Sequence, residues 1–110
     1  MKAITVSIWY RERIMLPPGS VVEVRIEDAS HADTSAAVLS SSTFVVASGP
    51  PYDVVLDYDP AMLEPQGRYG VRARISVDGV LRFTTTEYVP AFDHRDDEPL
   101  MVMMSAVAPT

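Results

Sequence analysis

The chain contains no cysteine, which excludes disulfides, thiolate metal sites and a thiol nucleophile. Cations are also scarce, because nine lysines and arginines stand against fifteen aspartates and glutamates, for a formal net charge of −6. Nucleic acids are bound mainly through clustered cations, so this balance argues against a nucleic-acid partner. No apolar run approaches the length of about eighteen residues that a membrane-spanning helix needs, and no secretory signal is recognisable. We expect contact with a membrane only through a tether that lies outside this sequence.

The remaining residues indicate one all-β domain over positions 1–110. A chain of this length buries roughly two thirds of its unfolded surface, which suffices for a single core. Between Val22 and Glu27 every second residue is apolar and the others are charged, the pattern of a strand with one buried face. Short alternating segments separated by Pro, Gly and Asp turns predict an antiparallel β-sandwich of seven or eight strands, Greek-key-like in order. Seven strands are predicted, at residues 2–10, 21–28, 36–47, 52–58, 69–77, 80–88 and 99–107.

The hairpin around Asp78 and Gly79 permits a prediction of register. A three-residue loop that begins at Val77 pairs Ile75 with Leu81 and keeps the neighbouring arginines outside. Gly79 is then expected in the left-handed region.

Tyr69 follows a Pro-Gln-Gly turn, a spacing typical of a tyrosine corner, in which the hydroxyl bonds the backbone a few residues upstream. The alternative is that Tyr69 simply begins a strand with its ring in the core. Just before this turn, Asp59 and Pro60 have the residue types of a helix cap and a first helical position.

No catalytic set can be assembled from the sequence. His31 and the run from Asp93 to Glu98 contain metal-ligating residue types, but in polar loops whose spacing matches no established metal site. Asp53, Asp57 and Asp59 alternate on one side of a strand, where acids improve solubility and protect an edge; acid-base chemistry would also require a pocket and a shifted pKa. We therefore predict no catalytic residue, no metal, no cofactor and no enzymatic activity.

Three apolar residues are candidates for contact with a partner protein. Trp9, the only tryptophan, is expected on the outward side of its strand, where a large aromatic ring can anchor a partner unless another segment covers it. The last strand is apolar on both faces, and its Met101 and Met103 suit an adaptable binding surface. The alternative for both methionines is ordinary core packing.

Several segments together resemble the YbaY/YscW lipoprotein family, which includes pilotin-like chaperones of type III secretion. The most distinctive are Tyr-Arg-Glu-Arg-Ile at Tyr10–Ile14 and Leu-Pro-Pro-Gly at Leu16–Gly19, followed by alternating strand residues. The similarity extends over about positions 6–88. It continues through Val22–Asp28, Leu56, Tyr58–Pro60, Tyr69–Ile75 and Leu81–Thr85.

The resemblance implies a small β-sandwich of the bacterial envelope, in the periplasm or on the inner face of the outer membrane. Relatives are usually tethered there through a lipidated cysteine that this chain does not contain, and some bind secretin subunits as pilotins. It supplies no catalytic residues. We therefore predict a non-enzymatic binding or chaperone-like module that recognises a protein segment by edge-strand or apolar-groove contacts. Self-association and transport of a small apolar ligand are the alternatives.

Overall fold

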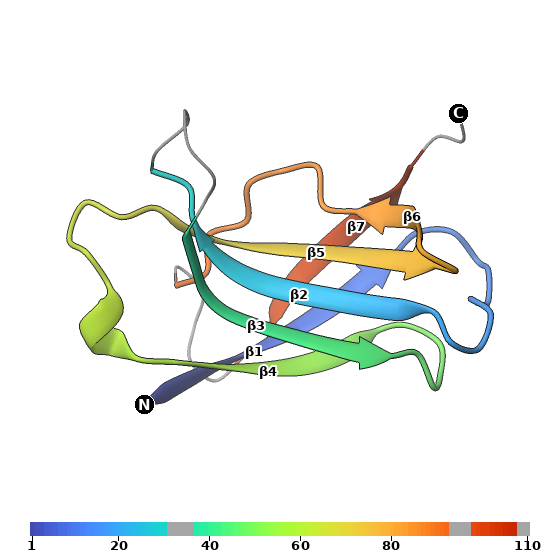
Figure 1. Cartoon of the computed structure of the whole chain (residues 1–110), viewed down its shortest axis with the longest axis horizontal. Coiled ribbons are helices and arrows are strands. Elements are labelled where there is room, and N and C mark those ends of the chain that lie inside the picture. Colours follow the sequence, from blue (N-terminus) through green and yellow to red (C-terminus); the bar gives the residue numbers. More distant parts are fainter. Residues whose placement is uncertain (31–36, 93–97, 108–110) are drawn as a thin grey trace.

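The computed structural model describes residues 1–30, 37–92 and 98–107. Its elements are the strands β1 (Lys2–Tyr10), β2 (Val21–Asp28), β3 (Ala37–Val45), β4 (Tyr52–Tyr58), β5 (Tyr69–Val77), β6 (Val80–Thr84) and β7 (Leu100–Ala106), and one 3-10 turn, η1 (Pro60–Met62) (Figure 1). All seven predicted strands are present, although β6 is shorter than expected. No helix in the described ranges has the length and hydropathy needed to cross a membrane.

The strands form one sheet in the order β3-β2-β5-β6-β7-β1-β4. Neighbours pair antiparallel except β1 and β7, which are parallel. The two edge strands, β3 and β4, lie beside each other (Figure 1), and the Ser40 hydroxyl donates a 2.6 Å hydrogen bond to the Asp57 carbonyl oxygen. The all-β prediction is confirmed, and the sheet is nearly closed on itself. The fold is therefore barrel-like rather than a sandwich of two separate sheets.

Alternation along the strands produces the core, as the sequence predicted. Every strand except β3 contributes buried inward residues to the core, and β3 contributes partly buried Leu39 and Phe44. Fully burying one aliphatic side chain contributes about 1.5–3 kcal/mol, so these rows dominate the stability of the fold. The largest buried aliphatic side chains are Ile8, Ile26, Leu56, Ile75 and Met104.

The hairpin between β5 and β6 corrects the predicted register. Its loop has two residues, Asp78 and Gly79, with φ angles of 51° and 81°. A register shift follows, so that Ile75 faces Phe83 instead of Leu81. The three-residue loop was wrong because the reasoning assumed an unbroken ladder; a bulge that adds one residue returns the apolar side chains to the inner face. Gly79 is left-handed, as predicted.

The tyrosine corner and the capped turn are both confirmed. The Glu64 amide donates a 2.8 Å hydrogen bond to the Tyr69 hydroxyl, and the Tyr69 ring lies 6.0 Å from that of Phe92, centroid to centroid. At η1, the Asp59 carboxylate accepts a 3.0 Å bond from the Ala61 amide.

Candidate partner-binding surface

The three predicted contact residues lie on one face of the sheet. In the ladder of β1 with β7, Ser7 is paired with Met101 and Trp9 with Met103. Paired residues of neighbouring strands project from the same side, and residues of the opposite parity, such as Val102, are buried in the core. Trp9, Met101 and Met103 therefore share the outward face of β1 and β7, although they are about ninety positions apart in the sequence.

The neighbouring strand β4 adds a fourth apolar residue to this face. Val55 is paired with Thr5 of β1 and is 60% exposed; Met101 is 56% exposed. Trp9 and Met103, which are paired, are both half-buried, so neither side chain is enclosed. We call these four residues, Trp9, Val55, Met101 and Met103, the outer patch.

Ser7 lies among the residues of the outer patch and is shielded from solvent. It projects outward between Met101 and Asp53, yet only 4% of it is exposed. An outward serine is shielded to this extent only where larger neighbours extend over it. The four residues of the patch therefore lie on three neighbouring strands of one outward face, with the shielded Ser7 between them.

The charge on this face is negative. Asp53 and Asp57 flank Val55 on the outward side of β4, and both are exposed. The other outward positions of β1, β4 and β7 are occupied by small, polar or apolar residues, and none by lysine or arginine. The carboxylates therefore border the apolar surface, and the one cation on these three strands, Lys2, occupies a position of the inward parity next to the row of Asp57.

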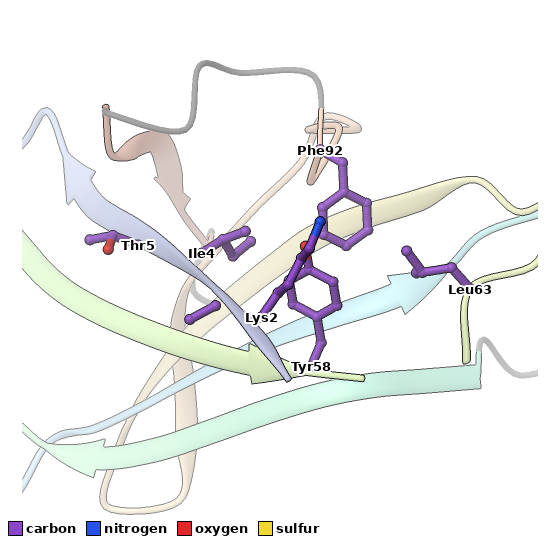
Figure 2. A pocket seen from close by; sticks show the side chains of 7 residues that line it. Lys2, Ile4, Thr5, Tyr58, Leu63 and Phe92 are labelled. Carbon is purple, nitrogen blue, oxygen red and sulfur yellow. The ribbon is translucent and has the colours of Figure 1, made fainter. Parts of the chain in front are cut away.

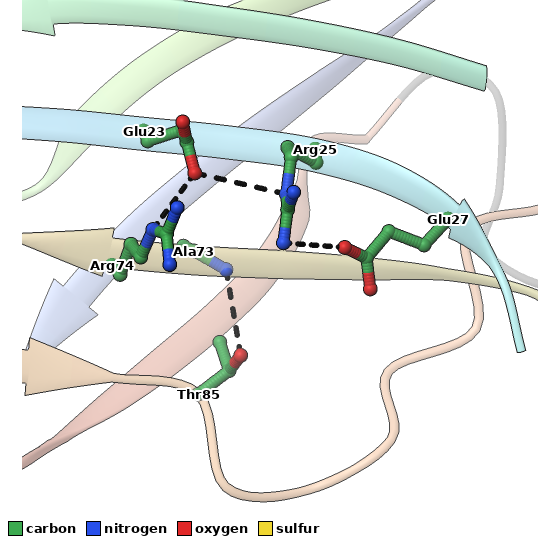
Figure 3. A network of polar contacts seen from close by, with 6 residues as sticks. All are labelled: Glu23, Arg25, Glu27, Ala73, Arg74 and Thr85. Atoms are coloured by element: carbon green, nitrogen blue, oxygen red, sulfur yellow. Dashed lines mark hydrogen bonds and ion pairs between the residues drawn. The ribbon is translucent and has the colours of Figure 1, made fainter. Parts of the chain in front are cut away.

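The outward face of β2 and β5 differs, because its charges are matched (Figure 3). Arg74 Nε lies 2.8 Å from Glu23 Oε1, and Arg25 bridges to Glu27 at 2.6 Å and to Glu23 at 3.7 Å. The Arg74 pair joins two strands, because Glu23 and Arg74 face each other in the β2–β5 ladder. Such solvated pairs each contribute under about 1 kcal/mol to the stability of the fold, so their main effect is to make this face hydrophilic.

A cavity of about 550 Å³ opens at the end of the sheet that holds the N-terminus (Figure 2). Tyr58 and Phe92 form its aromatic wall, with ring centroids 4.9 Å apart and planes inclined by 44°. The complete lining is Lys2, Ala3, Ile4, Thr5, Tyr58, Leu63 and Phe92.

A cleft of about 340 Å³ lies near the other ends of β1 and β7 and was missed by the sequence reasoning. It is lined in part by Ile14 and Met15, which are 48% and 78% exposed. The Tyr10 hydroxyl holds this segment by donating a 2.9 Å bond to the Ile14 carbonyl oxygen, while its ring stacks on Phe83 at 4.4 Å. The sequence signal that could have indicated this cleft is the pair of adjacent apolar residues, Ile14 and Met15, in a turn-rich segment.

Tyr52 is the described residue with a marked pKa shift. The residue is 5% exposed, and its hydroxyl forms no hydrogen bond of regular geometry with the described residues. Burial, and secondarily the nearby Tyr10 hydroxyl, raises the pKa of Tyr52 well above its usual value of 10.0.

The loop residues with metal-ligating chemistry are not tested by the structure. His31 and residues 93–97 lie outside the described residues. Within the described ranges, no group of three or more histidine and acidic side chains converges as metal ligands would.

Comparison with known proteins identifies the family. Residues 1–104 match the family described as type III secretion system lipoprotein chaperone (YscW). The chain belongs to this YscW family. It is 32% identical over 88 residues to the uncharacterized lipoprotein YbaY of Escherichia coli (strain K12), a match that covers 79% of this chain and 46% of the relative. The YscW-family chain thus spans about half the length of this curated relative.

The fold also resembles that of a solved pilotin. The structure of an alternative pilotin from the type II secretion system of Vibrio cholerae matches this YscW-family chain with a TM-score of 0.84 and 36% sequence identity, over 98% of each chain. The predicted resemblance is therefore confirmed by both sequence and fold.

Proposed function

We propose that this chain is a non-enzymatic, pilotin-like chaperone of the bacterial envelope that binds a segment of a secretion-system protein, such as a secretin subunit. The family description and the similarity to a secretion-system pilotin support this class of function. We further propose that the whole chain acts as one binding domain.

We propose the outer patch as the binding surface. The observation that carries this proposal is the convergence of Trp9, Met101 and Met103 on one outward face. A partly exposed tryptophan with flexible thioethers beside it provides large apolar contact area on a surface that can adapt its shape. Edge-strand addition has less support, because β3 and β4 lie against each other and are tied together by the Ser40 bond.

Site-specific photocrosslinking in cells tests this proposal. A photoreactive residue at Met101 is expected to give a discrete adduct with an envelope protein. Val80, which is 59% exposed at the β5–β6 hairpin, is the matched control with nearly the same exposure. No adduct from position 101, or identical adducts from positions 80 and 101, would contradict the proposal.

Transport of a small apolar ligand is the second candidate, supported by the cavity beside Tyr58. Its volume of about 550 Å³ falls in the range of ligand sites, and Ile4, Leu63 and the rings of Tyr58 and Phe92 form an apolar part of its lining beside polar groups such as Lys2 and Thr5. Phe92→Ala should then weaken binding of a fluorescent apolar probe, whereas Met101→Asp should not. Equal binding of the probe by both variants would exclude this cavity as the site.

A further inference from the structure

We infer that the segment bound at the outer patch carries lysine or arginine side chains next to its apolar residues. The inference rests on the proposed function and adds the chemistry of the partner. It follows from the arrangement of apolar and acidic residues on the outward face of β4, β1 and β7.

The two acids lie at fixed positions beside the apolar surface. Asp53 is in the same cross-strand row as Ser7 and Met101, whereas Asp57 is in the row of Ala3, with Val55 between the two acids. Residues four apart on a strand are separated by about 13 Å, so the carboxylates are spaced along one side of the apolar surface. A segment that covers Met101 and Val55 necessarily passes within reach of both acids.

Among the described residues, neither carboxylate has a side-chain partner. In the described residues, the side chains of Asp53 and Asp57 make no hydrogen bond and no ion pair, in contrast to Glu23 and Glu27 on the other face. A partner that covered the patch with apolar or acidic groups alone would desolvate these charges or oppose them. A partner with cations at these positions avoids both costs and is steered toward the face.

The same charges disfavour a second copy of this chain as the occupant. A dimer formed through the outer patch would bring the acids of both copies to one interface, and each copy has a formal charge of −6. The described outward positions of β1, β4 and β7 contain no lysine or arginine that could pair with these acids across such an interface.

Titration of Trp9 fluorescence with synthetic peptides tests the inference. Two peptides of equal length share the same leucine positions, and one has lysine where the other has glutamate. The lysine peptide is expected to shift the Trp9 emission at lower concentration and to lose affinity as salt is raised. The double variant Asp53→Asn/Asp57→Asn should weaken its binding by roughly two- to thirtyfold, since two exposed ion pairs are lost.

The matched control is Asp78→Asn/Glu87→Gln, which removes the same net charge from two exposed positions outside the outward face. It should leave the affinity of the lysine peptide unchanged. Equal binding of both peptides, or an equal loss of affinity in the two double variants, would overturn the inference. So would failure of both peptides to bind. In each case the proposed function stands if the Met101 crosslink forms, and it falls if that crosslink does not form.

Sedimentation equilibrium tests whether the occupant is a second copy of this chain. That occupant would form a dimer that Met101→Asp abolishes and Asp53→Asn/Asp57→Asn strengthens. Observation of such a dimer would overturn the inference.

Discussion

The contact between Gly67 and Tyr69 in the tyrosine corner has a defined geometry, from which we predict the effect of substitutions on the free energy of unfolding. A methyl group added at Gly67 would lie 2.5 Å from Tyr69 Cε2 and 2.8 Å from both Cζ and the hydroxyl oxygen. The ring must therefore move, and its 2.8 Å bond from the Glu64 amide is lost with it. Tyr69→Phe removes the same bond without moving the ring.

The expected free energies follow from these contacts. Tyr69→Phe should destabilise by about 1 kcal/mol, because one hydrogen bond is lost and the exposed Glu64 amide can bind water instead. Gly67→Ala should destabilise by about 1–3 kcal/mol, the usual range for forcing a packed ring aside. In the double variant the hydrogen bond can be lost only once. The sum of the single effects should therefore exceed the double effect by about 1 kcal/mol, the energy of that bond.

Urea unfolding of the four proteins measures this cycle. The control cycle pairs Tyr69→Phe with Gly79→Ala, where the added methyl meets no atom within 4 Å and the cost arises from the φ of +81° alone. That cycle should be additive within about 0.5 kcal/mol. If the Gly67 cycle is equally additive, the hydroxyl bond and the steric contact are independent and the reasoning is refuted.

Three further predictions concern the core, the sheet closure and alkaline pH. Leu56→Ala, at a position 1% exposed, should destabilise by about 2–5 kcal/mol in urea unfolding; a loss below about 1 kcal/mol would mean that the core is loosely packed. Ser40→Ala should speed amide hydrogen exchange in β3 and β4 without changing β5, because it removes the 2.6 Å bond between the edges. The raised pKa of Tyr52 means that the unfolded chain loses this proton first, so stability falls as pH rises above about 10, by up to about 1.4 kcal/mol per pH unit. Tyr52→Phe should remove that part of the decline, and identical pH profiles for the two proteins would contradict the assigned shift.

The elements of this fold could be predicted because their signals are local. Alternation from Val22 to Glu27 depends only on which side of a strand each residue faces, and the cap at Asp59 depends on its immediate neighbours. The prediction of the β5–β6 register failed because its signal is not local. A bulge beside Ile75 is a response to core packing across strands, and neither flanking sequence records it.

The arrangement of the strands, and with it the candidate surface, depends on contacts between distant segments. Alternation placed Trp9 on an outward face, and composition drew attention to Met103. Their proximity, however, results from the parallel pairing of β1 with β7, which no turn signal indicates. Val55 was overlooked because it lies between two aspartates, where the sequence pattern reads as a solvated edge.

The two outward faces of the sheet suggest how one β fold separates stability from recognition. Closure of the sheet uses the inner residues of every strand, so the outward positions are free to vary without loss of the core. On β2 and β5 they are occupied by paired arginines and glutamates, which keep that face hydrated. On β1, β4 and β7 they include the outer patch and two acids that pair with no side chain in the described part of the molecule. A surface selected only for solubility has no need for a half-buried tryptophan and methionine beside an exposed methionine and valine, so this face is the one on which a partner should be sought.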